Sequence, residues 1–248
     1  MGAITVITSG KGGVGKSTVT TGLGIALANR GRRVLLIDGD AGLGCLDHML
    51  GVSEQQVFDI ADVVSGSIEP NKAVYSCPFV QGLFLLPAPN SQDDVVSPEI
   101  MKQLVSVLAR YYDHVLIDSP AGVGGGFLSA IAPAQHALVV STPDPVCLRN
   151  SNKARVLLEQ AGIMQQRLVV NRFSSNNFRM QGFYPDLDSV IDSAGIRLIA
   201  VIPEDSLLAA ASAKSASAPQ KSAGAMALGR LAARLEGEQV PLAAVQKF

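Results

Sequence analysis

A short glycine-rich segment near the amino terminus constrains the fold of this chain more than any other feature. Residues 10–17 read Gly-Lys-Gly-Gly-Val-Gly-Lys-Ser. The apolar run 4–8 before them predicts a strand, whereas residues 16–29 have the spacing of a helix. A strand that turns through glycines directly into a helix is the first half of a βαβ unit. The sequence therefore predicts a parallel sheet with crossover helices.

The same alternation of short apolar runs and helical patterns continues along the chain. We expect strands at 4–8, 33–38, 83–87, 114–118, 137–141, 168–171 and 198–202, and helices at 16–29, 98–111, 126–132, 150–161 and 206–213. Runs 34–37 and 115–117 are apolar without alternation, so helices should cover both faces of the sheet. The predicted fold class is α/β, a doubly wound and mostly parallel sheet. Residues 209–225, rich in Ala and Ser, predict either a pair of helices or a loose connection.

Composition favours one globular domain in a reducing compartment. The 248 residues are 48% hydrophobic and 17% charged, enough for one large core over residues 1–248, with a flexible tail expected at 238–248. The net charge of -1 gives no general basic field for nucleic acid. Cys45, Cys77 and Cys147 form no CxxC pair. No secretory signal and no apolar run of about 20 residues are present, so we expect a cytoplasmic protein.

The glycine-rich segment also fits GxxxxGK[ST], and we call residues 10–17 the phosphate loop. Backbone N–H groups of such a loop surround phosphate oxygens, and the following helix adds its positive dipole end. Lys16 should reach the β and γ phosphates, and the Ser17 hydroxyl should ligate Mg²⁺. The sequence predicts that ATP and Mg²⁺ bind here, with contacts from Gly10, Lys11, Gly12, Gly13, Val14, Gly15, Lys16, Ser17 and Thr18.

Acidic residues follow two other predicted strands. Asp38 and Asp40 end one strand, and Asp118 ends another. Ligands of parallel sheets bind beyond the carboxyl ends of the strands, so these acids should converge on the phosphate loop. Asp118 is then the acid on the Mg²⁺ side, and Gly122 would let the following segment respond to the γ-phosphate.

Residues 11–17 resemble the deviant Walker A motif of the MinD/ParA ATPases, of which Lys11 is the distinguishing residue. In that family this lysine contacts the nucleotide bound by the other subunit of an ATP-sandwiched dimer. The resemblance therefore implies a catalytic role for Lys11 beside Lys16, and an ATP-dependent homodimer.

The resemblance covers most of the chain and is strongest to the MinD branch. Residues 38–47 are similar to its first switch, which implies that Asp40 positions or activates water and that Asp38 helps Ser17 and Asp118 to hold Mg²⁺. Residues 118–122 are similar to its second switch. Residues 170–172 and 201–205 resemble the segments around adenine, which implies contacts from Asn171, Arg172, Pro203, Glu204 and Asp205. The implied function is placement of the division septum, with an activator and a division inhibitor of the MinE and MinC type.

Some residues depart from the family pattern. Gly44 and Cys45 stand where Arg and Asn are usual, Gly124 and Gly125 replace larger or acidic residues, and Asn150 stands where Asp is frequent. In the family these positions belong to the dimer and partner face. The resemblance therefore specifies the partner less closely than it specifies ATP.

The carboxyl-terminal residues depart further from the family pattern than these positions do. MinD proteins usually end in an amphipathic helix with several Lys or Arg. Here Leu242, Val245 and Phe248 can share a helical face, but Lys247 is the only cation in residues 240–248. Attraction to anionic lipid would be about 1 kcal/mol. A weak peripheral contact with the inner face of the cell membrane and a disordered end both stay open.

Other functions share the phosphate loop. ParA-like partitioning would bind DNA through a basic surface, and cations are scattered without a dense run at Arg167, Arg172, Arg179, Arg197, Lys214 and Lys221. Iron–sulfur carriers need interface thiolates, and no cysteine lies between Asp118 and Cys147. Bacterial tyrosine kinases carry a carboxyl-terminal tyrosine cluster, but the last tyrosine here is Tyr184. A scaffold that binds ATP and hydrolyses little also stays open.

Overall fold

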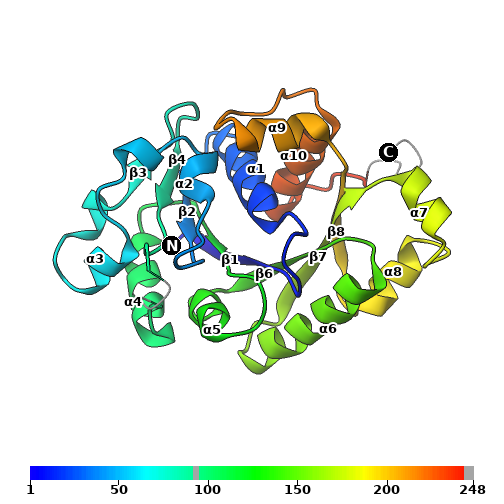
Figure 1. Ribbon diagram of the computed structural model, residues 1–248, viewed down its shortest axis with the longest axis horizontal. Coiled ribbons are helices and arrows are strands. Elements are labelled where there is room, and N and C mark those ends of the chain that lie inside the picture. The colour runs from blue at the N-terminus through cyan, green and yellow to red at the C-terminus, as the bar shows by residue number, and fades with distance from the viewer. Residues whose placement is uncertain (92–94, 243–248) are drawn as a thin grey trace.

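The computed structural model describes residues 1–91 and 95–242 (Figure 1). In these residues eight strands form one sheet in the order β3-β4-β2-β5-β1-β6-β7-β8, and only the β3–β4 pair is antiparallel. The strands are β1 (Ala3–Thr8), β2 (Val34–Asp38), β3 (Tyr75–Ser76), β4 (Leu83–Leu86), β5 (His114–Asp118), β6 (His136–Ser141), β7 (Gln165–Phe173) and β8 (Leu198–Pro203).

Helices connect these strands. The α-helices are α1 (Lys16–Ala28), α2 (Leu46–Met49), α3 (Ile60–Val64), α4 (Pro98–Leu108), α5 (Gly125–Ile131), α6 (Pro145–Gln160), α7 (Ser175–Gln181), α8 (Leu187–Ala194), α9 (Ser206–Ala213) and α10 (Ala223–Leu235), and two 3₁₀ turns are η1 (Ser53–Gln55) and η2 (Pro70–Lys72).

Each central strand contributes to two separate cores. Val115 and Ile117 of β5 lie in the core with residues of α4, α5, α6 and α8, whereas Leu116 lies in the core with residues of α1 and α10. Figure 1 shows these two groups of helices on opposite sides of the sheet. Because both faces are covered, the central strands are apolar throughout. The predicted doubly wound, mostly parallel α/β fold is confirmed.

Every predicted strand and helix overlaps an observed one, but the start of one helix was predicted incorrectly. The helix expected at 150–161 begins at Pro145, with Asp144 as its N-cap. The Asp144 carboxylate accepts a hydrogen bond from the Cys147 backbone N–H at 3.0 Å. Proline at the first helical position needs no N–H partner, so the segment that looked like a loop begins the helix.

The largest missed element is α10. Of the two alternatives for residues 209–225, the structure contains both: α9 ends at Ala213, a connection follows, and α10 starts at Ala223. Gly224 and Gly229 weaken the local helix preference of α10. Leu228 packs so closely on α1 that a Cβ on Gly22 would lie 2.4 Å from its Cδ1 atom. Tertiary packing therefore determines this helix. The short elements β3, α2, α3, α7 and α8 were also not predicted.

The carboxylate of Asp205 joins α9 to α10. Its Oδ1 atom accepts hydrogen bonds from the N–H groups of Leu207 at 2.9 Å and Leu208 at 3.3 Å, and its Oδ2 atom accepts one from Gly224 N–H at 2.7 Å. Burial raises the pKa of Asp205, but the hydrogen bonds from Gly224, Ser222 and the α9 N-terminus outweigh it, so the pKa lies below its ordinary value. The ionised carboxylate therefore stabilises the fold.

We expect Asp205→Ala to lower the free energy of unfolding by about 2 kcal/mol at pH 7, because three backbone donors lose their acceptor. The pKa is depressed on folding, so this contribution is present above the ordinary aspartate value of about 3.9 and is lost as pH falls through the folded-state pKa. Urea denaturation of both proteins at pH 7 and pH 3 measures it. The exposed neighbour gives the control: Glu204→Ala should change stability by less than about 0.5 kcal/mol. Equal losses for the two variants would contradict the capping role.

Candidate active site

The sheet places the predicted phosphate loop and the two strand-end acids at one edge. β5 lies between β1 and β2, and Asp118 is in register with Ile7 on one side and Asp38 on the other. The phosphate loop leaves β1 directly beyond this point. Both carboxylates therefore flank the loop at the carboxyl ends of the strands, as the sequence predicts.

Backbone geometry of the phosphate loop requires glycine at specific positions. Gly13 and Gly15 have φ values of 79° and 87°, in the left-handed region. A Cβ atom on Gly15 would also lie 2.4 Å from Asn171 Nδ2. The same Asn171 amide donates to the Val14 carbonyl at 2.8 Å. Asn171, at the end of β7, thus holds the loop from the opposite side to Asp118.

Three side chains of the loop and α1 converge on Asp118. Lys16 Nζ lies 3.0 Å from Oδ1, Ser17 Oγ donates to Oδ2 at 2.6 Å, and Thr20 Oγ1 donates to Oδ1 at 2.8 Å. Lys16 and Asp118 are both buried, with 8% and 1% of their surface exposed. A buried charge needs a partner of opposite charge, and Lys16 and Asp118 are such partners for each other. Thr20 was missed by the sequence analysis, although its spacing of four residues from Lys16 places it on the same helix face.

Asp38 is a buried carboxylate held by backbone groups. It accepts hydrogen bonds from the N–H groups of Asp40 at 3.1 Å, Cys45 at 3.0 Å and Leu46 at 3.1 Å. Burial and then the neighbouring charge of Asp118 raise its pKa to about 6, against the lowering effect of these hydrogen bonds and of Lys16. Two carboxylates at neighbouring strand ends therefore create a region of negative charge beside the Ser17 hydroxyl.

This donor set fits a hard divalent cation. Mg²⁺ binds carboxylate and hydroxyl oxygens, usually with one or two carboxylates and several waters. Ser17 and Asp118 already lie within hydrogen-bond distance of each other. A cation beside Asp38 and Asp118 would offset their mutual repulsion, which is the second cause, after burial, of the raised Asp38 pKa. Ser17, Asp38 and Asp118 are thus suitable residues to hold Mg²⁺.

Comparison with known proteins agrees with this geometry. The ParA family model, described as NUBPL iron-transfer P-loop NTPase, matches residues 1–227. The septum site-determining protein MinD of Thermotoga maritima is 38% identical over 247 residues, covering 98% of this chain and 91% of that protein. The chain belongs to the MinD/ParA family of P-loop NTPases.

Solved structures place it near the MinD members of this family. MinD in a MinC:MinD cell division complex of Aquifex aeolicus superposes with a TM-score of 0.89 at 34% identity, covering 98% of this chain and 99% of that one. MinD of Pyrococcus horikoshii complexed with Mg-ADP gives a TM-score of 0.84 at 30% identity, covering 95% and 96%. As a MinD/ParA member, this chain has the nucleotide-binding and ATPase character of that family.

In this MinD/ParA chain the phosphate loop opens onto a cavity of about 230 Å³. Its lining brings together loop residues, Asp40 of the first switch, Ala121 of the second switch and Arg172 of β7. Burial is the largest effect on Asp40 and raises its pKa, followed by Lys16, which lowers it, and Asp118, which raises it. Ala121 was not predicted as a lining residue, although it lies within the predicted second switch.

The residue that distinguishes the MinD/ParA loop, Lys11, is exposed to solvent. Its charge is one of the causes that lower the pKa of Asp144, after the hydrogen bonds at the α6 N-terminus. A Cβ on Gly10 would lie 2.2 Å from the backbone of Asn150, so α6 packs directly against the start of the loop. Lys11 therefore lies at the surface, where its charge acts on the carboxylate of Asp144.

The departures Gly44 and Cys45 lie against the buried acid of the first switch. A Cβ on Gly44 would meet Asp38 Oδ2 at 2.8 Å and the Cβ of Ala88 at 3.0 Å. Burial raises the pKa of the Cys45 thiol, whereas a hydrogen bond with Ser17 lowers it. In this conformation Gly44 has no room for the larger residue usual in the family.

Residues 203–205 lie beside the end of β7. Pro203 is in register with Phe173, and the Glu204 N–H donates to the Phe173 carbonyl at 2.9 Å. Arg172 has a positive φ of 52°, unusual for a residue other than glycine. The two segments that the resemblance assigns to adenine are therefore neighbours, although both carboxylate oxygens of Asp205 are used by helix N-termini.

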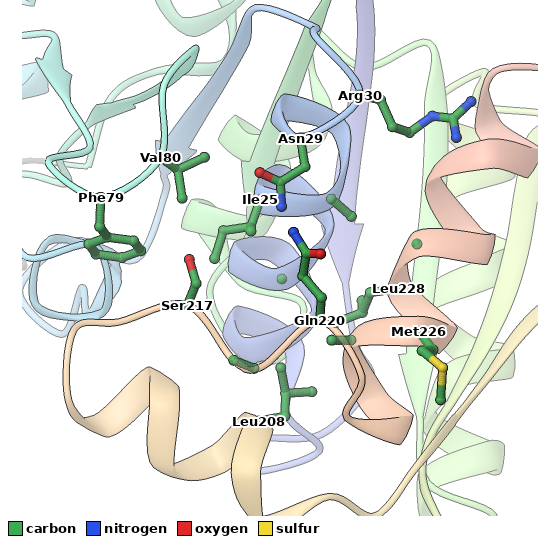
Figure 2. Close-up of a pocket in the computed structure, with 15 residues that line it drawn as sticks. Ile25, Asn29, Arg30, Phe79, Val80, Leu208, Ser217, Gln220, Met226 and Leu228 are labelled. Atoms are coloured by element: carbon green, nitrogen blue, oxygen red, sulfur yellow. The ribbon is translucent and has the colours of Figure 1, made fainter.

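A larger cavity, of about 460 Å³, lies on another side of the molecule between α1, α10 and the connection 214–222 (Figure 2). Apolar residues such as Ile25, Val80 and Leu228 line it, with Arg30 at its edge. Arg30 is already paired with Glu236 and Glu238. This cavity has no convergent set of charged groups to compare with that at the phosphate loop.

We expect Asp38 to titrate with a midpoint at about 6 in the nucleotide-free protein. Because folding raises this pKa, the folded state favours the protonated carboxyl, and the stability contributed by Asp38 falls as pH rises through about 6. Carboxyl ¹³C NMR over pH 3–8 measures the midpoint. Asp118→Asn should move it down, because the charge of Asp118 is the second cause of the shift. A midpoint below about 4 in the wild-type protein would rule out this electrostatic arrangement.

Proposed function

We propose that this chain is a MinD-like ATPase switch that dimerises on ATP, binds a partner or membrane surface, and releases it on hydrolysis, in placement of the division septum. The observation that carries the proposal is the convergence of Lys16, Ser17 and Thr20 on Asp118, beside an exposed Lys11. This arrangement supports a phosphate and Mg²⁺ site within one chain, with an exposed cation beside it.

Nucleotide binding changes the partner of Lys16 in this proposal. Lys16 leaves Asp118 for the β and γ phosphates, which the glycine N–H groups of the loop surround. Asp118 is then free to hold Mg²⁺ together with Ser17 and Asp38. The bound cation supplies charge neutralisation at the phosphates during transfer.

Asp40 positions the attacking water. Its backbone N–H is bonded to Asp38, and its side chain lines the cavity above the loop. The position of Asp40 is therefore linked to that of a Mg²⁺ ligand. A water held by Asp40 would lie on the γ-phosphate side of the cavity, as hydrolysis to ADP and phosphate requires.

Lys11 completes the site of a second copy of the chain. Because Lys11 lies outside the buried cluster, an isolated subunit lacks its charge at the phosphates. Hydrolysis should therefore be slow until an ATP-dependent homodimer forms and a partner completes the arrangement.

Adenine binds between the two neighbouring segments at the ends of β7 and β8. Asn171, Arg172, Pro203 and Glu204 contribute contacts, and Asp205 acts by holding this turn on α9 and α10. Asn171 also links the base to the phosphate loop through the Val14 carbonyl. Backbone N–H groups of the loop and of the first turn of α1 contact the phosphates in this proposal, at Gly10, Gly12, Gly13, Gly15 and Thr18.

The partners proposed are a division inhibitor of the MinC type and an activator of the MinE type, since the Aquifex aeolicus neighbour is a MinC:MinD complex. No helix in residues 1–91 and 95–242 is long and apolar enough to cross a membrane. We propose a single domain over 1–248 in the cytoplasm, with peripheral membrane contact through the tail 238–248. On the apolar face of this tail, Leu242 is exposed. Val245 and Phe248 of the same face, and the cation Lys247, lie outside the described residues.

The dimer mechanism predicts different failures for two variants. A non-hydrolysable ATP analogue with Mg²⁺ should double the mass of the wild-type protein in light scattering, and Lys11→Ala should stay monomeric. Asp40→Ala should still dimerise but lose turnover by roughly 100-fold or more, because the water is no longer positioned. Lys102→Ala, an exposed lysine on α4, is the control and should match wild type. A wild-type protein that stays monomeric with the analogue, or a Lys11→Ala protein that dimerises normally, would overturn the mechanism.

Sedimentation with vesicles of anionic lipid distinguishes septum placement from DNA partitioning. We expect ATP-dependent binding to vesicles that weakens in high salt, and its loss when residues 241–248 are removed. Salt-dependent binding to non-specific DNA instead would favour a ParA-like role. The same truncation should leave ATP-dependent dimerisation unchanged, which separates membrane contact from folding.

A further inference from the structure

The amino-terminal edge of the sheet, opposite the phosphate loop, contains a cavity lined by both apolar and cationic residues. It has a volume of about 210 Å³, and we call it the amino-edge cavity. Strand register brings its lining together: Ala3 pairs with His114, Thr5 with His136, and His136 with Gln165. Arg167 of β7 and Arg234 near the end of α10 complete its polar lining. Residues from five adjacent strands and one helix thus meet at a site remote from the loop.

Arg234 is a partly buried cation whose partners are neutral. Its Nε atom donates to the Val240 carbonyl at 2.8 Å, and Nη1 donates to the Ile199 carbonyl. Its Nη2 atom is buried and has no hydrogen-bond partner in the described part of the chain. Burial lowers the pKa of Arg234, and the charge of Arg230 lowers it further. A buried guanidinium without a carboxylate is costly unless an anion accompanies it.

Arg167 is likewise a cation whose hydrogen-bond partner is neutral. Arg167 Nη1 donates to the Gln166 carbonyl at 2.9 Å, and within residues 1–91 and 95–242 neither Arg167 nor Arg234 forms a salt bridge. Glu236 approaches His114 Nε2 at 3.9 Å, but it is bonded to Arg30 and Arg32. The cavity is therefore lined by two cations whose charges no carboxylate neutralises.

We propose that the amino-edge cavity binds a small oxyanion, a phosphate or carboxylate group, between Arg167, Arg234 and His136. Arginine presents N–H donors in a fork that matches such groups. None of its lining residues is a glycine, so it lacks the backbone donors with which the phosphate loop surrounds phosphates, and it suits a small anion held by side chains. The anion would accept hydrogen bonds from Arg167 and His136 and would offset the charge of Arg234 beside it.

Titration of the full chain, followed by NMR of arginine Nε–H and histidine ring signals, tests the site. Inorganic phosphate and succinate are added separately at constant ionic strength, with chloride as the reference anion. We expect saturable shifts of Arg234, Arg167 and His136 with at least one of them, and the effective anion identifies phosphate or carboxylate as the preferred group. Because the signals are local, phosphate at the loop is not mistaken for this site, and Lys16→Ala should retain the shifts.

Two matched variants decide the outcome. Arg167→Gln should weaken the anion about tenfold, because a charge-assisted hydrogen bond is lost. Arg230→Gln makes the same change one turn before Arg234 on α10, outside the cavity lining, and should weaken the anion clearly less than Arg167→Gln does. Shifts that do not saturate with either anion, or equal affinity in the two variants, would overturn the proposal. Arg167→Gln is preferred to a change of Arg234, whose bonds to Val240 and Ile199 also hold the end of α10.

Discussion

The ion pair between Lys16 and Asp118 is the interaction on which the rest of the site depends. It joins the first turn of α1 to the end of β5, and Ser17 and Thr20 strengthen the same contact. Both charged groups are buried, so each would be costly without the other. The pair fixes the lysine and hydroxyl that phosphate and Mg²⁺ need. In the proposed mechanism, Asp118 is released when Lys16 changes its partner.

The arrangement of charge around this pair explains how one sheet edge can act as a switch. Asp38 is buried beside Asp118, and burial first and the charge of Asp118 second raise its pKa. Asp40 is bonded through its backbone to Asp38, and the second switch follows Asp118 in the chain. In the proposed mechanism, a change at the phosphates reaches both switches through these neighbouring groups. Gly44 and Cys45, packed on Asp38, extend this coupling to the surface.

The two edges of the sheet have different chemistry for a topological reason. At the carboxyl edge the chain leaves β1 through glycines and exposes N–H groups toward an anion. At the amino edge there is no such loop, and the arginines Arg167 of β7 and Arg234 of α10 supply positive charge instead. The cations that appear scattered along the sequence are thus not equivalent. Arg167 lines a cavity with Arg234, whereas Arg172 belongs to the nucleotide side.

Much of the fold was predictable because its signals are local. Strand-glycine-helix order identified the phosphate loop, and unbroken apolar runs identified a sheet covered on both faces. Helix α10 and the early start of α6 were not predictable, because packing against α1 and a proline at the first helical position determined them. Among site residues, Thr20 and Ala121 were missed since neither belongs to the loop motif.

By itself, the sequence determined the phosphate loop, the positions of Asp38, Asp40 and Asp118 at strand ends, and the family to which the chain belongs. These follow from spacing within short segments, and spacing is a property of sequence. Only the tertiary structure decided that Lys16 faces Asp118, that Asp205 joins two helices, and that Arg167 meets Arg234. Each of these contacts joins residues distant along the chain, and strand order and burial alone bring them together.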